Sequence, residues 1–382
     1  MQNLIRLFIV LVVTIILGFK VYAVPIKIGA IYNISGGQAS LDLSSWQGAQ
    51  LAFINYKKNY NPYQKALYLF LHDGKTNPTT IIKEATLMFQ KEKAVIGFGL
   101  SDTDMVRAAA KAAKNTNRIF ITSGATSPTL PNVAENTVFL TCFSDNAQAA
   151  AAAEFCYKNL KARTAYILFD YKTTYTQLLI KYFEEAFEHL GGNILYEDFF
   201  SHDDIDLKSQ IAKLKTVEFN PDVLYIAAGP QDIGVIVKQI RKAGIKTPII
   251  GGDSYDTPLL ISTAGNFANQ IYFSNHAYIA NDNPNPAVKK FMVDYQNRFH
   301  CKPNAFAALG YDTFNLIATI LKNTKSFEKK DLTKSIYNLN NFVGLTGNIN
   351  YQNGTSIPKK DVFILKIDNK KISLAAVIKS SF

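Results

Sequence analysis

The amino-acid sequence predicts an α/β protein with two lobes, each built around a parallel β-sheet. Three observations indicate this fold. Short β-rich runs alternate with helical patterns, the alternation stops and restarts in the middle of the chain, and 382 residues exceed the roughly 150 that one domain usually holds. Strands that alternate with helices form right-handed βαβ units, so each sheet should be parallel and covered on both faces.

The first half of the chain contains four β-rich runs with helical patterns between them. We expect strands at 26–32, 67–72, 94–98 and 118–122. Residues 43–58 and 78–92 carry apolar side chains at helical spacing and should cover the sheet formed by these strands.

The same pattern restarts after residues 141–152, TCFSDNAQAAAA, where polar residues precede an alanine-rich helix. We expect strands at 164–169, 193–199, 222–229 and 247–253, and helices at 175–192, at 234–244 and from near Asp206. The rest is too short for a third lobe and should complete the first two. It holds helical patterns at 285–299 and 305–323 and a hairpin pattern, GNINYQNGT, with Asn353-Gly354 as its turn.

Residues 1–23 have the layout of a secretory signal peptide. Arg6 precedes an apolar run from Leu7 to Phe19, and Lys20 and the small residue Ala23 follow it. The run is shorter than the ~20 residues of a spanning helix, which favours cleavage after Ala23 over an uncleaved anchor. We expect a soluble protein exported to the periplasm of a bacterium.

Composition argues against several other classes of protein. Removing residues 1–23 lowers the formal charge from +11 to +9, but the lysines are scattered, so we expect no nucleic-acid partner. Cys142, Cys156 and Cys301 lack CxxC spacing, which leaves a Cys142–Cys156 bridge open and predicts no zinc site. The segment SHDDID (201–206) is either a metal cluster or, more simply, the acidic start of a helix. We expect no metal and no cofactor.

Two loops at the carboxyl ends of predicted strands are rich in small hydrogen-bond donors. These are GFGLSDTD (97–104), with Ser101 at the N-cap of the next helix, and ITSGATSPTL (121–130). Ligands of parallel sheets bind at such ends. Ser101 and Thr126, with backbone amides, are therefore candidates for a carboxylate-binding pocket, although both are also explained as caps.

A carboxylate on the second lobe would give the pocket an opposite pole. Asp253 in GGDSYDTP (251–258) follows a predicted strand and would either face the first lobe across a cleft or serve as a turn residue. A carboxylate opposite an anion pocket suits an amino acid. The sequence lacks GxSxG, HExxH and GxxxxGK[ST], and GFGLSD has Asp102 in place of the third glycine of a dinucleotide loop. We therefore expect a binding protein and not an enzyme.

The chain resembles the leucine/isoleucine/valine-binding protein family, the periplasmic solute receptors of branched-chain amino acid ABC transporters. The resemblance runs from about residue 26 to about residue 365. It is most specific in IGFGLSDTD, ITSGATSPTL, FSDNAQAAAAAEF, IRKAGIKTPIIGGDSYDTP, ALGYDTFNLIA and GLTGNINYQNG.

The resemblance implies two Rossmann-like lobes joined by a three-stranded hinge. Lobe 1 would hold residues 24–142 and 277–348, and lobe 2 would hold 143–276 and 349–382. It also implies roles in ligand binding. Ser101 and Thr126 would bind the ligand carboxylate, and the Gly124 carbonyl would accept from its ammonium group.

Three residues would serve the site from the crossover and lobe 2. Asp145 matches an acid at the first crossover, Tyr175 matches a tyrosine that lines the cleft, and Asp253 falls where the family places its ammonium-pairing acid. Trp46 either touches the ligand or packs in lobe 1.

Two departures from the family bear on ligand specificity. Leu41 stands where branched-chain receptors carry a tyrosine, and Gly229-Pro230 stand where they carry an aromatic residue. The ligand is therefore expected to be an α-amino acid, not necessarily leucine. A monomeric receptor would deliver it to a permease in the inner membrane. The alternative is a sensing or envelope-interaction protein of the same fold that binds a small carboxylate or amide.

Overall fold

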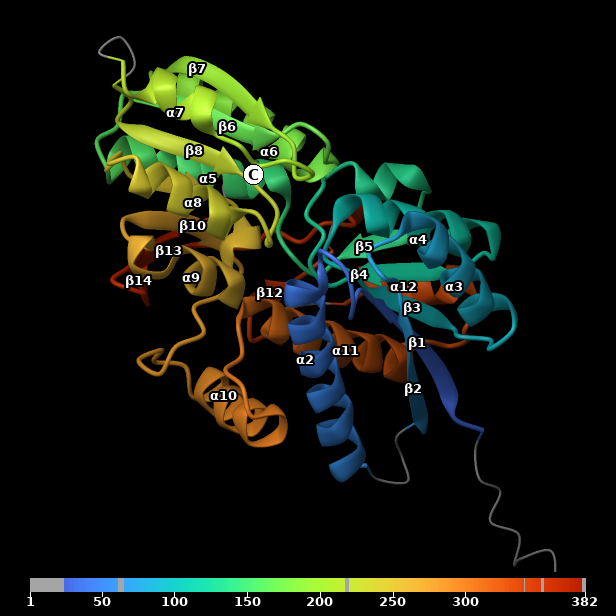
Figure 1. Cartoon of the computed structure of the whole chain (residues 1–382). Helices are drawn as coiled ribbons and strands as arrows, with labels where there is room; N and C mark the ends of the chain where they lie inside the picture. The colour runs from blue at the N-terminus through green and yellow to red at the C-terminus, as the bar shows by residue number, and fades with distance from the viewer. Residues whose placement is uncertain (1–23, 61–64, 217–219, 340, 352–353, 380–382) are drawn as a thin grey trace, which may run out of the picture.

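The computed structural model describes residues 24–60, 65–216, 220–339, 341–351 and 354–379. It contains two β-sheets, each covered by helices, that lie side by side as two lobes (Figure 1). The fold class expected from the sequence is confirmed. The proposed signal peptide lies outside the described residues. Within them, no helix combines the length and apolar character needed to cross a membrane.

Lobe 1 is built on a five-stranded, fully parallel sheet with the strand order β2-β1-β3-β4-β5. The strands are β1 (Ile26–Tyr32), β2 (Leu67–Asp73), β3 (Ile96–Gly99), β4 (Ile119–Thr122) and β5 (Val138–Leu140). The helices of this lobe are α2 (Ala39–Lys58), α3 (Pro78–Gln90), α4 (Thr103–Asn115), α10 (Pro286–Phe299), α11 (Ala305–Asn323) and α12 (Lys329–Tyr337).

Lobe 2 is built on a seven-stranded sheet with the strand order β14-β13-β10-β9-β8-β6-β7. Its five parallel strands are β6 (Thr164–Asp170), β7 (Asn193–Phe200), β8 (Val223–Ala227), β9 (Ile249–Gly251) and β10 (Ile271–Asn275). The antiparallel strands β13 (Val362–Asp368) and β14 (Lys371–Ile378) extend one edge. The helices are α5 (Asp145–Lys158), α6 (Thr174–His189), α7 (Lys208–Leu214), α8 (Ile233–Lys242) and α9 (Pro258–Ala264).

Helices α2 and α11 pack closely against each other because glycines lie at their contact. A Cβ added at Gly48 of α2 would lie 1.8 Å from the carbonyl oxygen of Ala307, and one at Gly310 of α11 would lie 1.8 Å from that of Ser45. Side chains larger than hydrogen do not fit there. This close packing fixes the start of α2 and the start of α11, both of which reach the cleft between the lobes.

The chain passes between the lobes three times. The crossings connect β5 to α5, β10 to α10, and the hairpin strand β12 (Gly347–Ile349) to β13. The buried ammonium group of Lys360, in the third crossing, donates hydrogen bonds to the carbonyl of Thr141 at 2.9 Å and to Thr346 Oγ1 at 2.6 Å. Burial lowers the pKa of Lys360 to about 8. Because Thr141 belongs to the first crossing, Lys360 ties two of the three crossings together.

Two local predictions are wrong. The hairpin pairs β11 (Phe342–Gly344) with β12 and turns at Leu345-Thr346, before the expected position, and Asn353 lies outside the described residues. Helix α7 has Leu207 as its N-cap and no acid in its first turn, so the segment 201–206 is not the start of a helix. Instead, Ser201 forms a β-bridge with Asp204.

Candidate functional site

A small cavity lies between the two lobes, at the carboxyl ends of the parallel strands. Its volume is about 30 Å³. The residues that line it are Gln38, Leu41, Ser101, Asp102 and Phe306 from lobe 1, and Thr173, Tyr175, Gly229, Pro230, Asp253 and Ser254 from lobe 2. Three predicted site residues, Ser101, Tyr175 and Asp253, are thus brought together from segments more than 70 residues apart. This is the position in which open parallel sheets bind ligands.

On the lobe 1 side, Ser101 presents a hydroxyl that no protein group uses. The N-cap of α4 is Asp102, not Ser101 as expected from the sequence, because Asp102 Oδ1 accepts from the amides of Asp104 and Met105 at 3.0 Å each. Ser101 Oγ is buried and makes no hydrogen bond. A buried polar atom without a partner is costly, so this hydroxyl is available for a ligand.

Gly124 allows the second loop to approach this hydroxyl. A Cβ at Gly124 would lie 2.9 Å from both Ser101 Oγ and the Phe306 ring. Only glycine therefore leaves space beside Ser101 and Phe306, which agrees with the close approach of backbone expected for this loop.

Asp42 lies beneath this side of the site. Asp42 Oδ2 accepts from the backbone amide and the side-chain amide of Asn33, both at 2.8 Å. Its Oδ1 faces the Ser101 hydroxyl without reaching hydrogen-bond geometry. Burial raises the pKa of Asp42 to about 7, against the effect of the Asn33 hydrogen bonds. Because Asp42 is partly protonated near neutral pH, it repels an anion bound at Ser101 less than a fully ionised carboxylate does.

Thr126 and Asp145 connect the lobes and do not line the cavity. Thr126 Oγ1 donates to Asp145 Oδ1 at 2.6 Å, and the Asp145 amide donates to the Thr126 carbonyl at 2.7 Å. Gln148 Nε2 donates to the same Asp145 oxygen at 3.1 Å. Burial raises the pKa of Asp145 to about 7. These bonds fix the second loop against the first turn of α5.

On the lobe 2 side, Asp253 accepts hydrogen bonds at both carboxylate oxygens. Tyr175 Oη donates to Oδ1 at 2.7 Å, and His276 Nε2 lies 2.8 Å from Oδ2. The Asp253 amide donates to Gln148 Oε1 at 3.1 Å. Asp253 is therefore held in one orientation at the wall of the cavity.

His276 was not predicted as a site residue. It is fully buried, and its ring stacks on Phe143 with the ring centres 3.9 Å apart. Burial holds the pKa of His276 below its ordinary value, so the ring is neutral and donates from Nε2 to Asp253. Because it is neutral, His276 orients the carboxylate without cancelling its charge. Asp253 follows β9 and His276 follows β10, and their meeting depends on strand pairing that the local sequence does not reveal.

Trp46 does not line the cavity. It is half-buried in the core of lobe 1, and its ring centre lies 6.0 Å from that of Tyr32. Tyr32 Oη in turn shares a hydrogen bond of 2.8 Å with Ser123 Oγ. Trp46 thus supports the second loop from behind. Leu41 and Gly229-Pro230, the two departures from the family, both line the cavity.

The lobes touch at the rim of the cleft. The carboxylate of Asp104, on α4, accepts from Thr174 Oγ1 at 2.7 Å and from the Thr174 amide at 3.2 Å. Thr174 is the first residue of α6, so an acid of lobe 1 interacts with a helix N-terminus of lobe 2. The lobes are therefore in contact on the α4 side.

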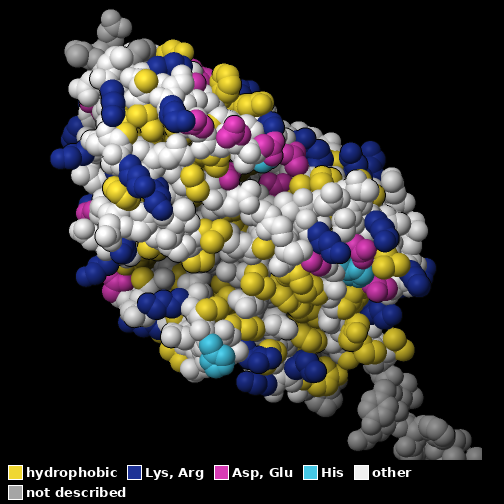
Figure 2. Space-filling model, viewed as in Figure 1, with side chains coloured by type: hydrophobic (Ala, Val, Ile, Leu, Met, Phe, Trp, Pro, Cys, Tyr) yellow, Lys and Arg dark blue, Asp and Glu magenta, His cyan; other side chains and the backbone are white. Residues whose placement is uncertain are grey.

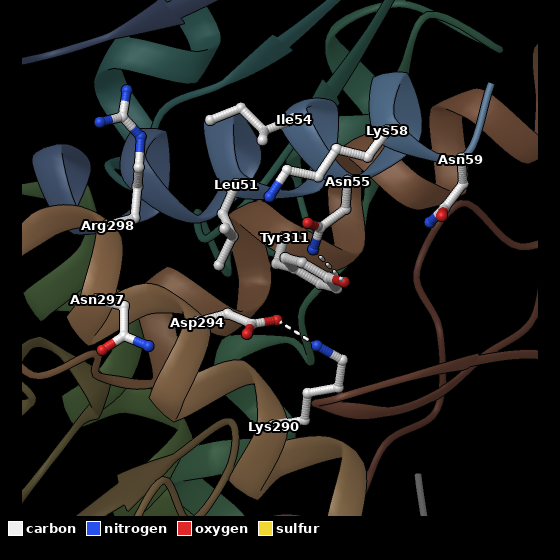
Figure 3. A pocket seen from close by; sticks show the side chains of 10 residues that line it. All are labelled: Leu51, Ile54, Asn55, Lys58, Asn59, Lys290, Asp294, Asn297, Arg298 and Tyr311. Atoms are coloured by element: carbon white, nitrogen blue, oxygen red, sulfur yellow. Dashed lines mark hydrogen bonds and ion pairs between the residues drawn. The ribbon is translucent and has the colours of Figure 1, made fainter.

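A larger hollow of about 610 Å³ lies away from this cleft, between α2, α10 and α11 (Figure 3). Its polar side chains interact mainly with one another. Lys290 pairs with Asp294 at 2.7 Å, and Asn55 donates to Tyr311 Oη at 3.4 Å. No buried unpartnered side chain among the described residues points to a ligand there, so the interlobe cavity is the stronger candidate.

Metal and disulfide chemistry receive no support within the described part of the chain. No group of three or more His, Cys, Asp or Glu side chains has the arrangement of a metal site there. His202 of the segment 201–206 instead pairs with Asp170 at 2.6 Å. Cys142, Cys156 and Cys301 are free thiols.

Comparison with known proteins identifies a family. Residues 25–371 match the family model described as periplasmic binding protein. An amino acid binding protein of Pseudomonas aeruginosa is 24% identical over 257 residues, which cover 67% of this chain and 68% of that protein. A Leu/Ile/Val-binding protein homolog of Brucella melitensis is 23% identical over 350 residues, which cover 91% of this chain and 92% of that protein.

Solved structures share the fold. The chain superposes on a leucine binding protein of Thermotoga maritima with a TM-score of 0.85 and 28% identity, covering 93% of this chain and 99% of that one. A branched-chain amino acid binding protein of Streptococcus pneumoniae in complex with isoleucine gives a TM-score of 0.85 at 23% identity, with the same coverage of both chains.

Proposed function

The chain belongs to the periplasmic binding protein family, and we propose that it captures an α-amino acid between its two lobes and delivers it to the permease of an ABC transporter. The observation that carries the proposal is the opposition of two polar groups across one cavity. Ser101 offers an unused buried hydroxyl on lobe 1, and Asp253 offers an oriented carboxylate on lobe 2. The carboxylate of an α-amino acid can accept from the Ser101 hydroxyl, and its ammonium group can donate to the Asp253 carboxylate.

Each group has a separate role in this proposal. Ser101 binds the ligand carboxylate through its unused hydroxyl. The amides of Asp104 and Met105 at the start of α4 are already held by the Asp102 carboxylate. Asp253 binds the ammonium group, held by Tyr175 and His276. Charge-assisted hydrogen bonds of this kind are worth about 1.5–3 kcal/mol each.

Thr126, Gly124 and Asp145 support the carboxylate end. Gly124 keeps space beside Ser101 and presents its carbonyl to the ammonium group. Thr126, whose hydroxyl is held by Asp145, acts behind the cavity wall by fixing the loop that carries Gly124. Trp46 contributes through packing behind this loop and not through contact with the ligand.

Capture proceeds by hinge closure. We assign residues 24–142 and 277–348 to lobe 1 and residues 143–276 and 349–382 to lobe 2, so that the three crossings act as the hinge. The ligand binds lobe 1 first, and closure then brings Asp253 and Tyr175 onto it. The Asp104–Thr174 contact stabilises the closed arrangement. Closure presents both lobes together to the permease.

The cellular setting follows from the same proposal. Residues 1–23 act as a signal peptide cleaved after Ala23, and the mature protein works in the periplasm as a monomer. It catalyses no reaction, which agrees with the solute-binding role of the family. A sensing protein of the same fold, specific for a small carboxylate or amide, is the alternative that the experiment must separate.

The test is a thermal-shift screen of residues 24–382, refolded to remove bound ligand, against α-amino acids, small amides and carboxylates. Ligand that binds the folded state raises the melting temperature in proportion to ln(1 + [L]/Kd). The proposal predicts a concentration-dependent rise with an α-amino acid, reduced in Ser101→Ala. The control Ser326→Ala removes a serine hydroxyl in the loop before α12, where it donates to Asp331. Its melting temperature without ligand should fall, but its ligand-induced rise should equal that of the wild type. A rise only with a carboxylate that lacks the amine would favour the alternative.

A further inference from the structure

The interlobe cavity is acidic although the chain as a whole is basic. The chain has 41 Lys and Arg against 30 Asp and Glu, yet among the described residues the lining of the cavity includes no Lys or Arg and two Asp. Figure 2 shows acidic side chains gathered beside the boundary between the lobes, whereas Lys and Arg side chains are spread over the outer faces. Asp253 accounts for one charge of an α-amino acid, which leaves the other acids unexplained.

Asp102 is the second acid in the lining. It forms no ion pair in the described structure, although the charge of Arg107 partly offsets the rise of its pKa. Its Oδ1 is used by the cap of α4, whereas Oδ2 accepts only a long 3.4 Å bond from Gln38 Nε2. Arg107, one turn along α4, lies 3.5 Å from Asp104 and makes no ion pair with Asp102. Burial raises the pKa of Asp102 to about 6, and the neighbouring charge of Asp104 adds to this. One carboxylate oxygen of Asp102 is therefore poorly satisfied at the cavity wall.

Asp232 lies behind the opposite wall. Gly229 lines the cavity, and a Cβ at Gly229 would lie 2.9 Å from Asp232 Oδ2. Asp232 is 5% exposed and forms no ion pair among the described residues. Burial raises the pKa of Asp232 to about 6, with Asp170 adding to the rise and His202 opposing it. The Asp232 carboxylate thus packs against Gly229, directly behind the cavity wall, and accepts a hydrogen bond from the Gly229 amide.

Asp102 lines the same cavity as Ser101 and Asp253, and Asp232 lies behind Gly229 in the opposite wall. Asp102 and Gln38 belong to lobe 1, and Gly229 with Asp232 belongs to lobe 2. Asp102 is partly buried and Asp232 almost fully buried, and neither forms an ion pair among the described residues. A cation placed between them would offset the cost of burying their charges. The cavity of about 30 Å³ is smaller than an amino acid, so the lobes must move apart to admit any ligand. The side chains of the cavity walls therefore indicate the class of ligand better than the cavity volume does.

We propose that the ligand is an α-amino acid whose side chain ends in an amine or a guanidinium, bound between Asp102 of lobe 1 and Asp232 of lobe 2. This rests on the proposed function, because Ser101 and Asp253 must first fix the α-carboxylate and the α-ammonium. Leu41 then contacts the methylene groups of the side chain in place of an aromatic residue. The second positive charge selects against leucine-like ligands.

The test compares ligands of the same shape and different charge. L-Ornithine and L-norleucine have side chains of equal length, and ornithine carries an amine where norleucine carries a methyl group. Their dissociation constants for residues 24–382 are measured by calorimetry at fixed ionic strength, together with those of L-lysine, L-arginine and L-leucine. A charge-assisted bond corresponds to about 10-fold or more in affinity, so at least one cationic ligand should bind at least that much more tightly than norleucine and leucine.

Variants locate the effect. Asp102→Asn and Asp232→Asn keep the shape of the side chain and its ability to cap a helix. Each should reduce the preference for the cationic ligand over norleucine by about 10-fold. Asp294→Asn removes the same charge on α10, outside the cleft, and should leave the preference unchanged.

Two results overturn the proposal in distinguishable ways. Norleucine or leucine binding as tightly as every cationic amino acid contradicts the cationic site and leaves the amino-acid receptor intact. No binding of any amino acid contradicts the receptor function itself and this proposal with it.

Discussion

Replacement of Asp253 by asparagine separates the charge of the ammonium site from its hydrogen-bond framework. In the wild type, Asp253 accepts from Tyr175 at 2.7 Å and from His276 at 2.8 Å. Asparagine offers one carbonyl oxygen and one amide NH2 group, so only one of these donors keeps its acceptor. His276 can adjust, because its Nδ1 has no partner and the proton can move there, which lets Nε2 accept from the new amide NH2 group.

The expected effect is therefore large on binding and small on stability. A charge-assisted bond to the ligand ammonium is worth about 1.5–3 kcal/mol, so the affinity of Asp253→Asn for an α-amino acid should fall by about one to two decades. Calorimetry measures the affinity, and thermal unfolding without ligand measures the stability. An affinity within twofold of wild type in a folded Asp253→Asn protein would refute the assignment.

Asp253→Ala provides the contrast. It leaves the Tyr175 hydroxyl and the His276 ring without an acceptor in a buried environment, at a cost of about 1–3 kcal/mol for each unsatisfied group. This variant should lose stability as well as affinity. Equal melting temperatures for the Ala and Asn variants would show that the framework around Asp253 is not as described.

Three further predictions concern other parts of the molecule. Ser101→Ala should lower affinity for the ligand by about 10-fold or more. Its melting temperature without ligand should change little, since no protein group uses the hydroxyl. A large loss of stability would contradict this. The stability of the protein without ligand should fall as pH rises from 5 to 7.5. Burial raises the pKa values of Asp42 and Asp145 to about 7, so in this range the folded state binds protons that the unfolded state has already released. Melting temperature against pH tests this, and Asp42→Asn should reduce the slope, so an unchanged slope would count against it. Gly48→Ala should destabilise lobe 1 by about 1–3 kcal/mol, measured by denaturant unfolding, because the new methyl group meets the Ala307 carbonyl oxygen at 1.8 Å. Wild-type stability of this variant would contradict the close packing of α2 on α11.

The alternation of strands and helices was predictable because it is local. The strand at 26–32 and the helix at 305–323 have the same bounds in the structure as in the prediction, since side-chain periodicity along a short segment determines both. The hairpin was placed wrongly because Asn353-Gly354 is a strong local turn signal. The turn at Leu345-Thr346 depends instead on a distant residue, Asp312 of α11, whose carboxylate accepts from both amides of the turn at 2.8 Å.

The site was predictable only in part, for the same reason. Ser101 and Asp253 stand at strand ends that the sequence marks clearly. The N-cap role of Asp102 was missed because Ser101 and Asp102 are both good caps and adjacent residues differ only in backbone geometry. His276 was missed because its role arises from the pairing of β9 with β10 and from stacking on Phe143, more than 100 residues away.

The most direct test of the account uses the ligand identified by the thermal-shift screen and two analogues, one without the α-amine and one without the α-carboxylate. Each analogue should bind residues 24–382 at least about 10-fold more weakly than the intact amino acid, because each loses one charge-assisted contact. Asp253→Asn should not weaken binding of the analogue that lacks the amine. Equal affinity of the intact ligand and either analogue would contradict capture of an α-amino acid between Ser101 and Asp253.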